Sequence, residues 1–123
     1  MKSDIKPDEI FVFGSNLAGR HGAGAARDAV EKYGAIYGQG VGLQGRSYGI
    51  PTKDITIRTL PLPYIDQAID DFMKFAESRR DLKFYITPVG CGLAGYTREQ
   101  IKPLFEGMPE NCRFAETWEL ETV

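Results

Sequence analysis

The sequence predicts an α/β protein, a three-layer α/β/α sandwich around a mixed, mostly parallel sheet. Apolar, strand-like segments alternate with amphipathic, helix-like segments in the order β, α, β, α, β, α, β. Two of the strand-like segments end in glycine-rich loops, as strands of such sheets do where they carry ligands. The 123 residues contain no linker, repeat or low-complexity tract, which predicts one domain over residues 1–123.

The first half of the chain supplies a strand, a helix and a glycine-rich stretch. Residues 9–15, "EIFVFGS", are apolar and aromatic, which predicts a buried strand. The next segment carries apolar side chains on one face at helical spacing, namely Ala26, Val30 and Tyr33. Gly34 is placed to end this helix. We expect residues 38–45 to be a loop because of their glycines, and residues 47–53 to be a short strand before a turn.

The second half predicts a long helix, a strand, a short helix and a last strand. Residues 64–81 carry an apolar stripe made of Ile65, Ala68, Ile69, Phe72, Phe75 and Ala76. Residues 83–90 read as a second buried strand. Thr97 stands three residues before Gln100, a capping-box pattern that opens a short helix. Residues 112–120 alternate between apolar and polar side chains, which predicts the last strand.

Composition excludes several classes of function. A net charge of -2 gives no general attraction to nucleic acid or anionic membrane, and no apolar run approaches the roughly 20 residues that span a bilayer. We therefore expect no membrane partner and no general nucleic-acid binding.

Only two cysteines occur and no secretory leader is recognisable, which favours a cytoplasmic protein without disulfides. One histidine and two distant cysteines do not make a zinc site, so no metal and no cofactor are expected.

The two glycine-rich loops, residues 14–26 "GSNLAGRHGAGAA" and 90–97 "GCGLAGYT", both follow predicted strands. Glycine lets the backbone approach a ligand closely, and backbone N–H groups at the start of a helix bind anions. Because parallel strands place these loops at one edge of the sheet, they predict a shared phosphate or diphosphate pocket. Neither loop matches the dinucleotide fingerprint or the P-loop, which disfavours those two nucleotide classes. Taken alone, "GAGAA" also fits close helix-to-sheet packing.

Single residues near these loops allow two interpretations each. His21 could contact a ligand hydroxyl or phosphate, or be an exposed loop residue without a role. Asn16 could bind a ribose hydroxyl or cap its own turn. Cys91 could be a nucleophile, although a small buried cysteine fits better because no base is tied to it. Tyr96 could cover a sugar or pack in the core, and Lys53 could be an ordinary surface charge.

Taken together, these segments resemble a known family. "IFVFGSN" leading into "HGAGAA" is similar to the first ligand loop of macrodomains, which are ADP-ribose-binding modules, and "YITPVGCGLAGYTREQIKPLF" is similar to their second, diphosphate-holding loop. The sequence most resembles the terminal ADP-ribose protein glycohydrolase branch and small phage and bacterial macro-like proteins. "IPTK" and "GCGLAG" stand in the same order as the lysine triplet and the loop of that branch. The resemblance runs from Phe11 to about Leu120 and implies a compact, macrodomain-like fold.

The resemblance also implies roles for individual residues. Asn16 would contact the distal ribose, and His21 would face the same sugar. Lys53 corresponds to the lysine that attacks the sugar C1, so His21 and Lys53 are the candidate catalytic residues. Besides Asn16, the implied ligand-binding residues are Gly22, Ala23, Gly24, Gly90, Cys91, Gly92, Leu93, Ala94, Gly95 and Tyr96. Ala94 stands where the branch has its catalytic aspartate, so the lysine-plus-aspartate mechanism does not carry over.

The leading hypothesis is a protein that binds ADP-ribose or a derivative and hydrolyses a bond at the distal ribose, as in ADP-ribose-1''-phosphate or an ADP-ribosyl ester. An ADP-ribosylated macromolecule is then a further partner. The alternative is a non-catalytic reader or sponge for ADP-ribose, for which Ala94 is the argument. A third hypothesis keeps the fold but assigns another nucleotide, such as a cytokinin-type or NAD-derived signal. Asp4 and Asp8 are the candidates for adenine recognition, without a clear register.

Overall fold

A five-stranded sheet forms the centre of the computed structural model, which describes residues 4–119. Within these residues the strands follow the order β2-β3-β1-β4-β5. Their bounds are β1 Glu9–Asn16, β2 Gly42–Gln44, β3 Ser47–Lys53, β4 Lys83–Ile86 and β5 Cys112–Phe114. β1 pairs in parallel with β3 and β4, and β4 pairs in parallel with β5, whereas β2 is antiparallel to β3. The sheet is therefore mixed and mostly parallel, which confirms the prediction.

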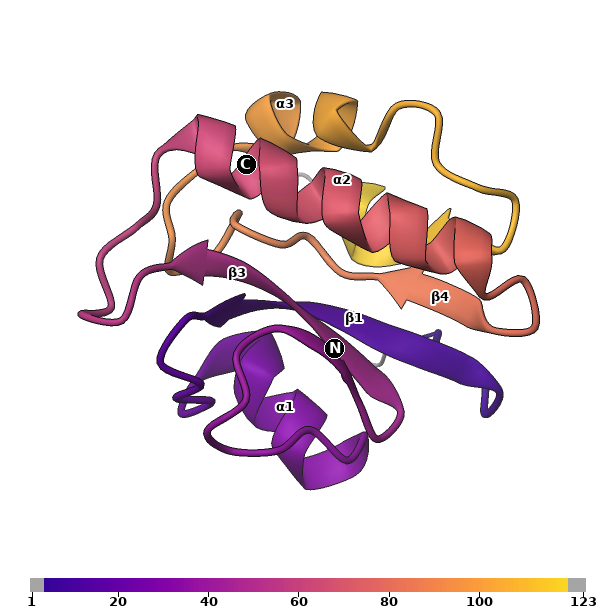
Figure 1. Cartoon of the computed structure of the whole chain (residues 1–123), viewed down its shortest axis with the longest axis horizontal. Helices are drawn as coiled ribbons and strands as arrows, with labels where there is room; N and C mark the ends of the chain where they lie inside the picture. The colour runs from indigo at the N-terminus through magenta and orange to yellow at the C-terminus, as the bar shows by residue number, and fades with distance from the viewer. Residues whose placement is uncertain (1–3, 120–123) are drawn as a thin grey trace.

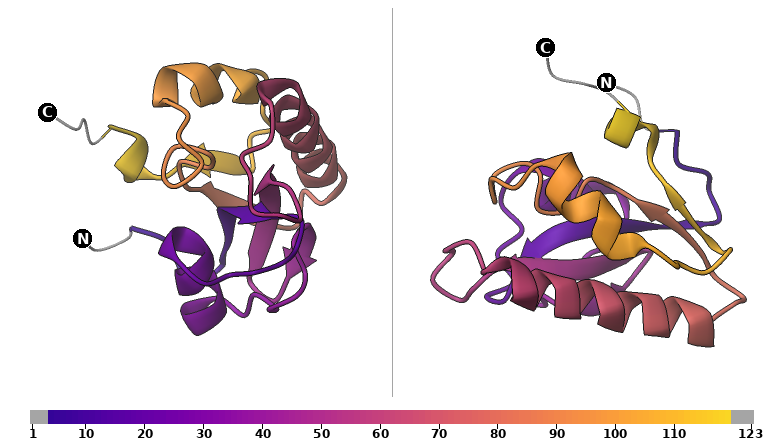
Figure 2. Two further views of the ribbon diagram at one scale, coloured as in Figure 1. Left: turned by 90° about the vertical axis from the view of Figure 1, so that its left-hand side faces the viewer. Right: turned by 90° about the horizontal axis from the view of Figure 1, so that it is seen from above.

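Helices cover both faces of this sheet. The α-helices are α1 Gly24–Lys32, α2 Leu62–Ser78 and α3 Arg98–Ile101, and two 3-10 helices, η1 Lys102–Phe105 and η2 Glu116–Glu119, follow later in the chain. α1 lies on one face, while α2 and α3 lie on the other (Figures 1 and 2). This is the predicted three-layer sandwich. No helix within residues 4–119 has the length and apolar content needed to cross a membrane.

Aromatic contacts fill the two interfaces between the layers. On the α1 side, Phe11 of β1 stacks on Tyr33 with 4.4 Å between ring centroids. On the α2 side, Phe72 meets Tyr48 of β3 and Phe84 of β4 edge-on, with centroid separations of 5.0 and 5.2 Å. Aromatic pairs in this geometry add stability beyond their buried area. The alternation of side chains along each strand therefore locks both helical layers onto one sheet.

Trp118 in η2 closes the far side of the sheet, next to β5. Its indole is 2% exposed and donates from Nε1 to the Ile86 carbonyl at 2.7 Å. The ring also packs against Phe105 and Phe114. A buried indole needs an acceptor for its N–H, and the end of β4 supplies it.

A half-buried ion pair joins β1 to β5, near the two ends of the described chain. Glu9 is 4% exposed, and Arg113 of β5 donates to its carboxylate from Nε at 2.7 Å and from Nη2 at 2.9 Å. Arg113 also pairs with Asp4 at 3.0 Å and lies over the Tyr85 ring. Hydrogen bonding from Arg113 holds the pKa of Glu9 below its usual range.

Most predicted elements are confirmed at the residue level. The helix after the first glycine loop forms as α1 and is followed by Gly34, whose φ of 74° suits glycine at that position. Four of the six stripe residues of α2 are fully buried, namely Ile65, Ile69, Phe72 and Ala76. The capping box also forms: Thr97 accepts from the N–H of Gln100, whose side chain accepts from the N–H of Thr97.

Three predictions of element bounds were wrong. Residues 38–45 contain β2, which forms because "QGR" reverses the chain and lets Gly42 pair with Gly49 on the edge of the sheet. The strand expected at 83–90 ends at Ile86: the Thr87 N–H still bonds to the Val12 carbonyl, but the next residue is Pro88, which has no N–H to continue the ladder. The last strand ends at Phe114 instead of continuing to position 120, because η2 carries Trp118 into the core; position 120 lies outside the described residues.

Candidate functional site

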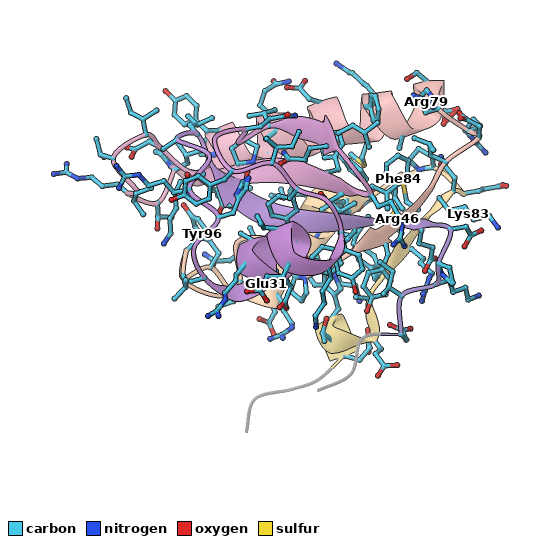
Figure 3. All side chains as sticks on the ribbon, turned by 90° about the horizontal axis from the view of Figure 1, so that it is seen from below. Glu31, Arg46, Arg79, Lys83, Phe84 and Tyr96 are labelled. Atoms are coloured by element: carbon cyan, nitrogen blue, oxygen red, sulfur yellow. The ribbon has the colours of Figure 1, made fainter. Side chains whose placement is uncertain are left out.

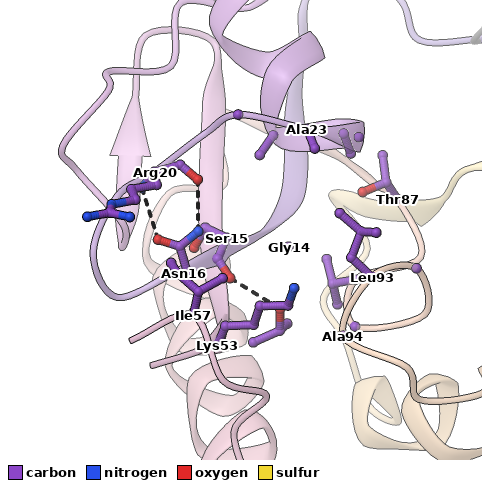
Figure 4. A pocket seen from close by; sticks show the side chains of 18 of the residues that line it. Gly14, Ser15, Asn16, Arg20, Ala23, Lys53, Ile57, Thr87, Leu93 and Ala94 are labelled. Atoms are coloured by element: carbon purple, nitrogen blue, oxygen red, sulfur yellow. Dashed lines mark hydrogen bonds between the residues drawn. The ribbon is translucent and has the colours of Figure 1, made fainter. Parts of the chain in front are cut away.

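A cavity of about 650 Å³ opens at the carboxyl ends of β1 and β3 (Figure 4). The end of β1, the start of α1, the end of β3 and the loop after β4 all line it. Its volume lies within the range of small-molecule sites, and its place is where parallel sheets bind ligands. The two glycine-rich loops therefore meet in one cavity, as predicted.

The start of α1 presents unpaired backbone N–H groups to this cavity. Ala23 is the N-cap residue, with an extended backbone and no side-chain hydrogen bond to the helix. The cavity is lined here by Gly22, Ala23, Gly24, Ala25 and Ala26. The first N–H groups of a helix have no partner within the helix, and the dipole adds partial positive charge at this end. An uncapped helix start facing a cavity offers backbone donors of the kind that anions accept from.

The loop after β4 supplies a second set of backbone donors. The residues of this loop that line the cavity are Gly90, Gly92, Leu93 and Ala94. Three backbone hydrogen bonds close the loop, donated by the N–H groups of Cys91, Gly95 and Tyr96. In the described part of the chain, the N–H groups of Gly92, Leu93 and Ala94 have no acceptor. Gly90 has φ 75°, a value that favours glycine and shapes the turn.

Lys53 stands at the end of β3 and reaches into the cavity. Its backbone is fixed because its carbonyl accepts from the Leu17 N–H at 2.9 Å and it bridges to Thr59. Figure 4 shows the side chain between Ser15 and Ala94. No carboxylate within residues 4–119 pairs with its ammonium group. The cavity thus holds one lysine that is free to meet a ligand.

Asn16 lines the cavity, but its amide closes the first loop. Its Nδ2 donates to the Arg20 carbonyl at 2.8 Å, and its Oδ1 accepts from the Arg20 N–H at 2.9 Å. The interpretation that Asn16 caps its own turn is therefore correct. One further N–H of the amide remains for a ligand, so contact with the ribose stays a prediction.

The structure places His21 away from the cavity. The side chain is 3% exposed, its Nε2 lies 2.8 Å from the Gln39 carbonyl, and its ring meets Phe13 edge-on at 5.2 Å. A carbonyl only accepts, so Nε2 carries the proton, and Nδ1 has no partner in the described residues. The loop folds back over β1 because Gly19 packs closely against Gly38, which turns the imidazole inward. His21 is a core residue here and does not face the place expected for the ribose.

Three residues of the second loop also lie outside the cavity lining, namely Cys91, Gly95 and Tyr96. The Tyr96 hydroxyl donates to the Leu60 carbonyl at 2.7 Å, so the ring packs between loops instead of covering a sugar. Figure 3 shows Tyr96 at the end of the molecule opposite Lys83. The Cys91 thiol donates to the Val89 carbonyl at 3.5 Å, and burial raises its pKa, which opposes a role as nucleophile.

Sequence reasoning missed several residues that line the cavity, namely Arg20, Tyr37, Thr52, Ile57, Thr87, Pro88 and Val89. Tyr37 is 63% exposed and comes from a loop whose course the sequence does not reveal. Thr87 and Pro88 could have been found, since they directly follow a strand at the ligand edge. None of the residues that line the cavity is a carboxylate. The candidates for adenine recognition are used elsewhere, Asp4 with Arg113 and Asp8 with Lys83.

Comparison with known proteins identifies the fold. No family model and no curated protein matches the sequence. Among solved structures, the macrodomain of Mycobacterium tuberculosis DarG is similar with a TM-score of 0.61 and 18% identity, over 89% of this chain and 90% of that one. The macrodomain of Thermus aquaticus DarG is similar with a TM-score of 0.58 and 20% identity, over 89% and 88%. This chain therefore has a macrodomain fold, as its two loops implied.

Proposed function

We propose that this protein binds ADP-ribose or an ADP-ribose derivative in the cavity and hydrolyses a bond at the distal ribose. One observation carries this proposal. Unpaired backbone N–H groups from the start of α1 and from residues 92–94 lie at the same cavity, which Lys53 also lines. The macrodomain fold supports it, because the family that the sequence resembles binds ADP-ribose at these loops.

The donor set suits a diphosphate in particular. The chain as a whole is acidic, with a net charge of -2, so long-range attraction does not concentrate an anion. Backbone donors on two sides of the cavity neutralise a diphosphate locally, without needing a cluster of cationic side chains. The volume of about 650 Å³ accommodates a nucleotide-sized ligand.

Lys53 is the residue that we propose acts on the distal ribose. The substrates would be ADP-ribose-1''-phosphate or an ADP-ribosyl ester, with an ADP-ribosylated macromolecule as the larger partner. Once a water molecule has taken its proton, the Lys53 amine would form a bond to C1 of the distal ribose while the C1–O bond to the phosphate or acyl group breaks and that group leaves as an anion. Water would then attack C1, release the sugar and return the proton to Lys53. His21 is buried under the loop and bonded to the Gln39 carbonyl, so it would take no part in proton transfer.

A second candidate function is a reader that binds the ligand without cleaving it. The specific observation in its favour is that no carboxylate lines the cavity, so none there can accept a proton from Lys53 or from water. Ala94 occupies the position where the resembling branch has its aspartate, and its side chain has no polar atom.

Calorimetry with ADP-ribose and a turnover assay on ADP-ribose-1''-phosphate and an ADP-ribosylated protein test these functions. We expect the wild-type chain to bind and turn over a substrate, and Lys53→Ala to abolish turnover. Lys32→Ala, an exposed lysine at the end of α1, is the matched control and should change affinity by less than about twofold. Binding without turnover would support the reader. Absence of binding at millimolar ADP-ribose would refute both.

A further inference from the structure

Ile57 has a backbone conformation that its side chain disfavours. Its φ is 66°, and no other residue except glycine has a positive φ within residues 4–119. A branched side chain in the left-handed region brings Cβ close to the following carbonyl, which costs free energy. Such a residue persists where its surroundings impose the conformation, and it is found mostly at functional sites. The side chain of Ile57 lines the cavity beside Lys53 (Figure 4).

The turn that holds Ile57 is fixed by many hydrogen bonds. Oδ1 of Asp54 accepts from the Thr56 N–H at 2.8 Å, from the Thr56 hydroxyl at 2.7 Å and from the Arg58 N–H at 3.0 Å. The Asp54 N–H donates to the Arg58 carbonyl at 2.8 Å. The Thr59 hydroxyl donates to the Ala94 carbonyl at 2.9 Å and so ties the turn to the second ligand loop. This network maintains the strained conformation at Ile57.

The core does not explain why isoleucine stands at this position. Ile57 is partly exposed and belongs neither to the buried cluster nor to the apolar residues packed against it. Glycine or asparagine would adopt the same φ with less strain. The strained conformation therefore puts an apolar side chain at the cavity wall but does not stabilise the fold. Residues of this kind occur mostly at ligand-binding and catalytic sites.

We propose that Ile57 is a specificity-determining residue, whose side chain packs against the terminal sugar and makes the cavity favour ADP-ribose over ADP. The inference rests on the proposed function, because it requires the sugar to lie beside Lys53. Burying the apolar face of a sugar ring against Ile57 gains free energy that a ligand ending at the diphosphate cannot gain.

Calorimetry with ADP-ribose and with ADP, on wild-type protein and on Ile57→Gly and Ile57→Asn, tests the inference. Both variants should bind ADP-ribose about tenfold more weakly and bind ADP within about twofold of wild type. Asparagine tolerates the left-handed region without the added freedom of glycine, so agreement between the variants assigns the effect to the side chain. Ile55→Ala, in the same turn but 69% exposed and outside the cavity lining, is the matched control and should bind both ligands as wild type does.

Thermal unfolding of the same proteins completes the test. Ile57→Gly should melt at or above the wild-type temperature, because the strain is removed. Weaker ADP-ribose binding together with a lower melting temperature would overturn the inference, since Ile57 would then serve the fold. Equal loss of both ligands would also overturn it, as would unchanged affinity for ADP-ribose. If the wild-type protein binds no ADP-ribose at all, the proposed function fails together with the inference.

Discussion

His21 illustrates how a single side chain separates a ligand role from a structural one. His21→Ala removes a buried ring and leaves the Gln39 carbonyl without this donor, so the free energy of unfolding should fall by about 2 kcal/mol. ADP-ribose affinity of the folded variant should stay within about twofold of wild type, because the ring does not line the cavity. Urea unfolding and calorimetry measure the two quantities. Full stability with lost affinity would restore the expectation that His21 faces the ribose.

Residue roles could be predicted only where short-range chemistry decides them. The Thr97 and Gln100 pair lies within one turn, so its capping box was readable directly. Asn16 and His21 share a loop, yet one lines the cavity and the other is buried, because the close contact between Gly19 and Gly38 sets the path of the loop. The left-handed backbone of Ile57 depends on the whole hydrogen-bonded turn, and no pattern of residue types reveals it.

At the scale of elements, α1 starts without a side-chain cap, which leaves the N–H groups of its first turn unpaired. Ala23→Asp should stabilise the chain by about 1 kcal/mol, since Ala23 has the extended backbone of an N-cap and a carboxylate there accepts from the first turn. The same carboxylate should weaken ADP-ribose binding at least about tenfold, because it occupies the donors and repels the diphosphate. Urea unfolding and calorimetry on one preparation measure both effects.

Ala23→Ser is the control for this substitution. A serine hydroxyl also caps the helix but carries no charge, so it should stabilise the chain similarly and weaken binding much less than aspartate does. Equal loss of affinity with both variants would point to steric blockage instead of charge. Unchanged affinity with aspartate would contradict the anion site at the start of α1.

Elements were predictable where one periodicity dominates. β1 contains an unbroken apolar run from Ile10 to Phe13, and α2 carries a stripe of period 3.6. Both formed close to the expected bounds. β2 was missed because it has three residues, one of them Gly42, and exists through antiparallel pairing with β3. β4 was expected to reach position 90, although Pro88, which has no N–H for the ladder, was a local sign that the strand ends sooner.

At the scale of the molecule, the Glu9–Arg113 pair links β1 to β5 and makes stability depend on acid pH. The pKa of Glu9 is lowered in the folded state by hydrogen bonding from Arg113, so its stabilisation is complete above the ordinary glutamate pKa of 4.5 and is lost as the pH falls through the lower folded value. The free energy of unfolding should therefore decline below about pH 4.5. Urea unfolding between neutral and strongly acid pH measures this decline.

Glu9→Gln should lower the free energy of unfolding by about 2 kcal/mol at neutral pH and reduce the acid decline. Asp81→Asn removes an exposed pair with Arg79, where the Asp81 side chain is 62% exposed, and should change little. If wild type and Glu9→Gln lost stability in parallel on acidification, Glu9 would not be the group that titrates.

The fold itself was predictable from the alternation of elements. The link between Glu9 and Arg113, across 104 residues, was not, since the spacing of charges in the sequence does not show which strands meet.

The position of Trp118 gives the protein an internal optical reporter. It is the only tryptophan in the chain, it is buried beside β4, and it does not line the cavity. Its fluorescence therefore follows unfolding of the whole molecule without being quenched directly by a nucleotide. A ligand that binds only the folded state raises the free energy of unfolding, by about 2.7 kcal/mol when its concentration is one hundred times its dissociation constant. The unfolding midpoint rises with it. Candidate nucleotides can thus be ranked by the shift they cause in this one emission, without labelling the protein.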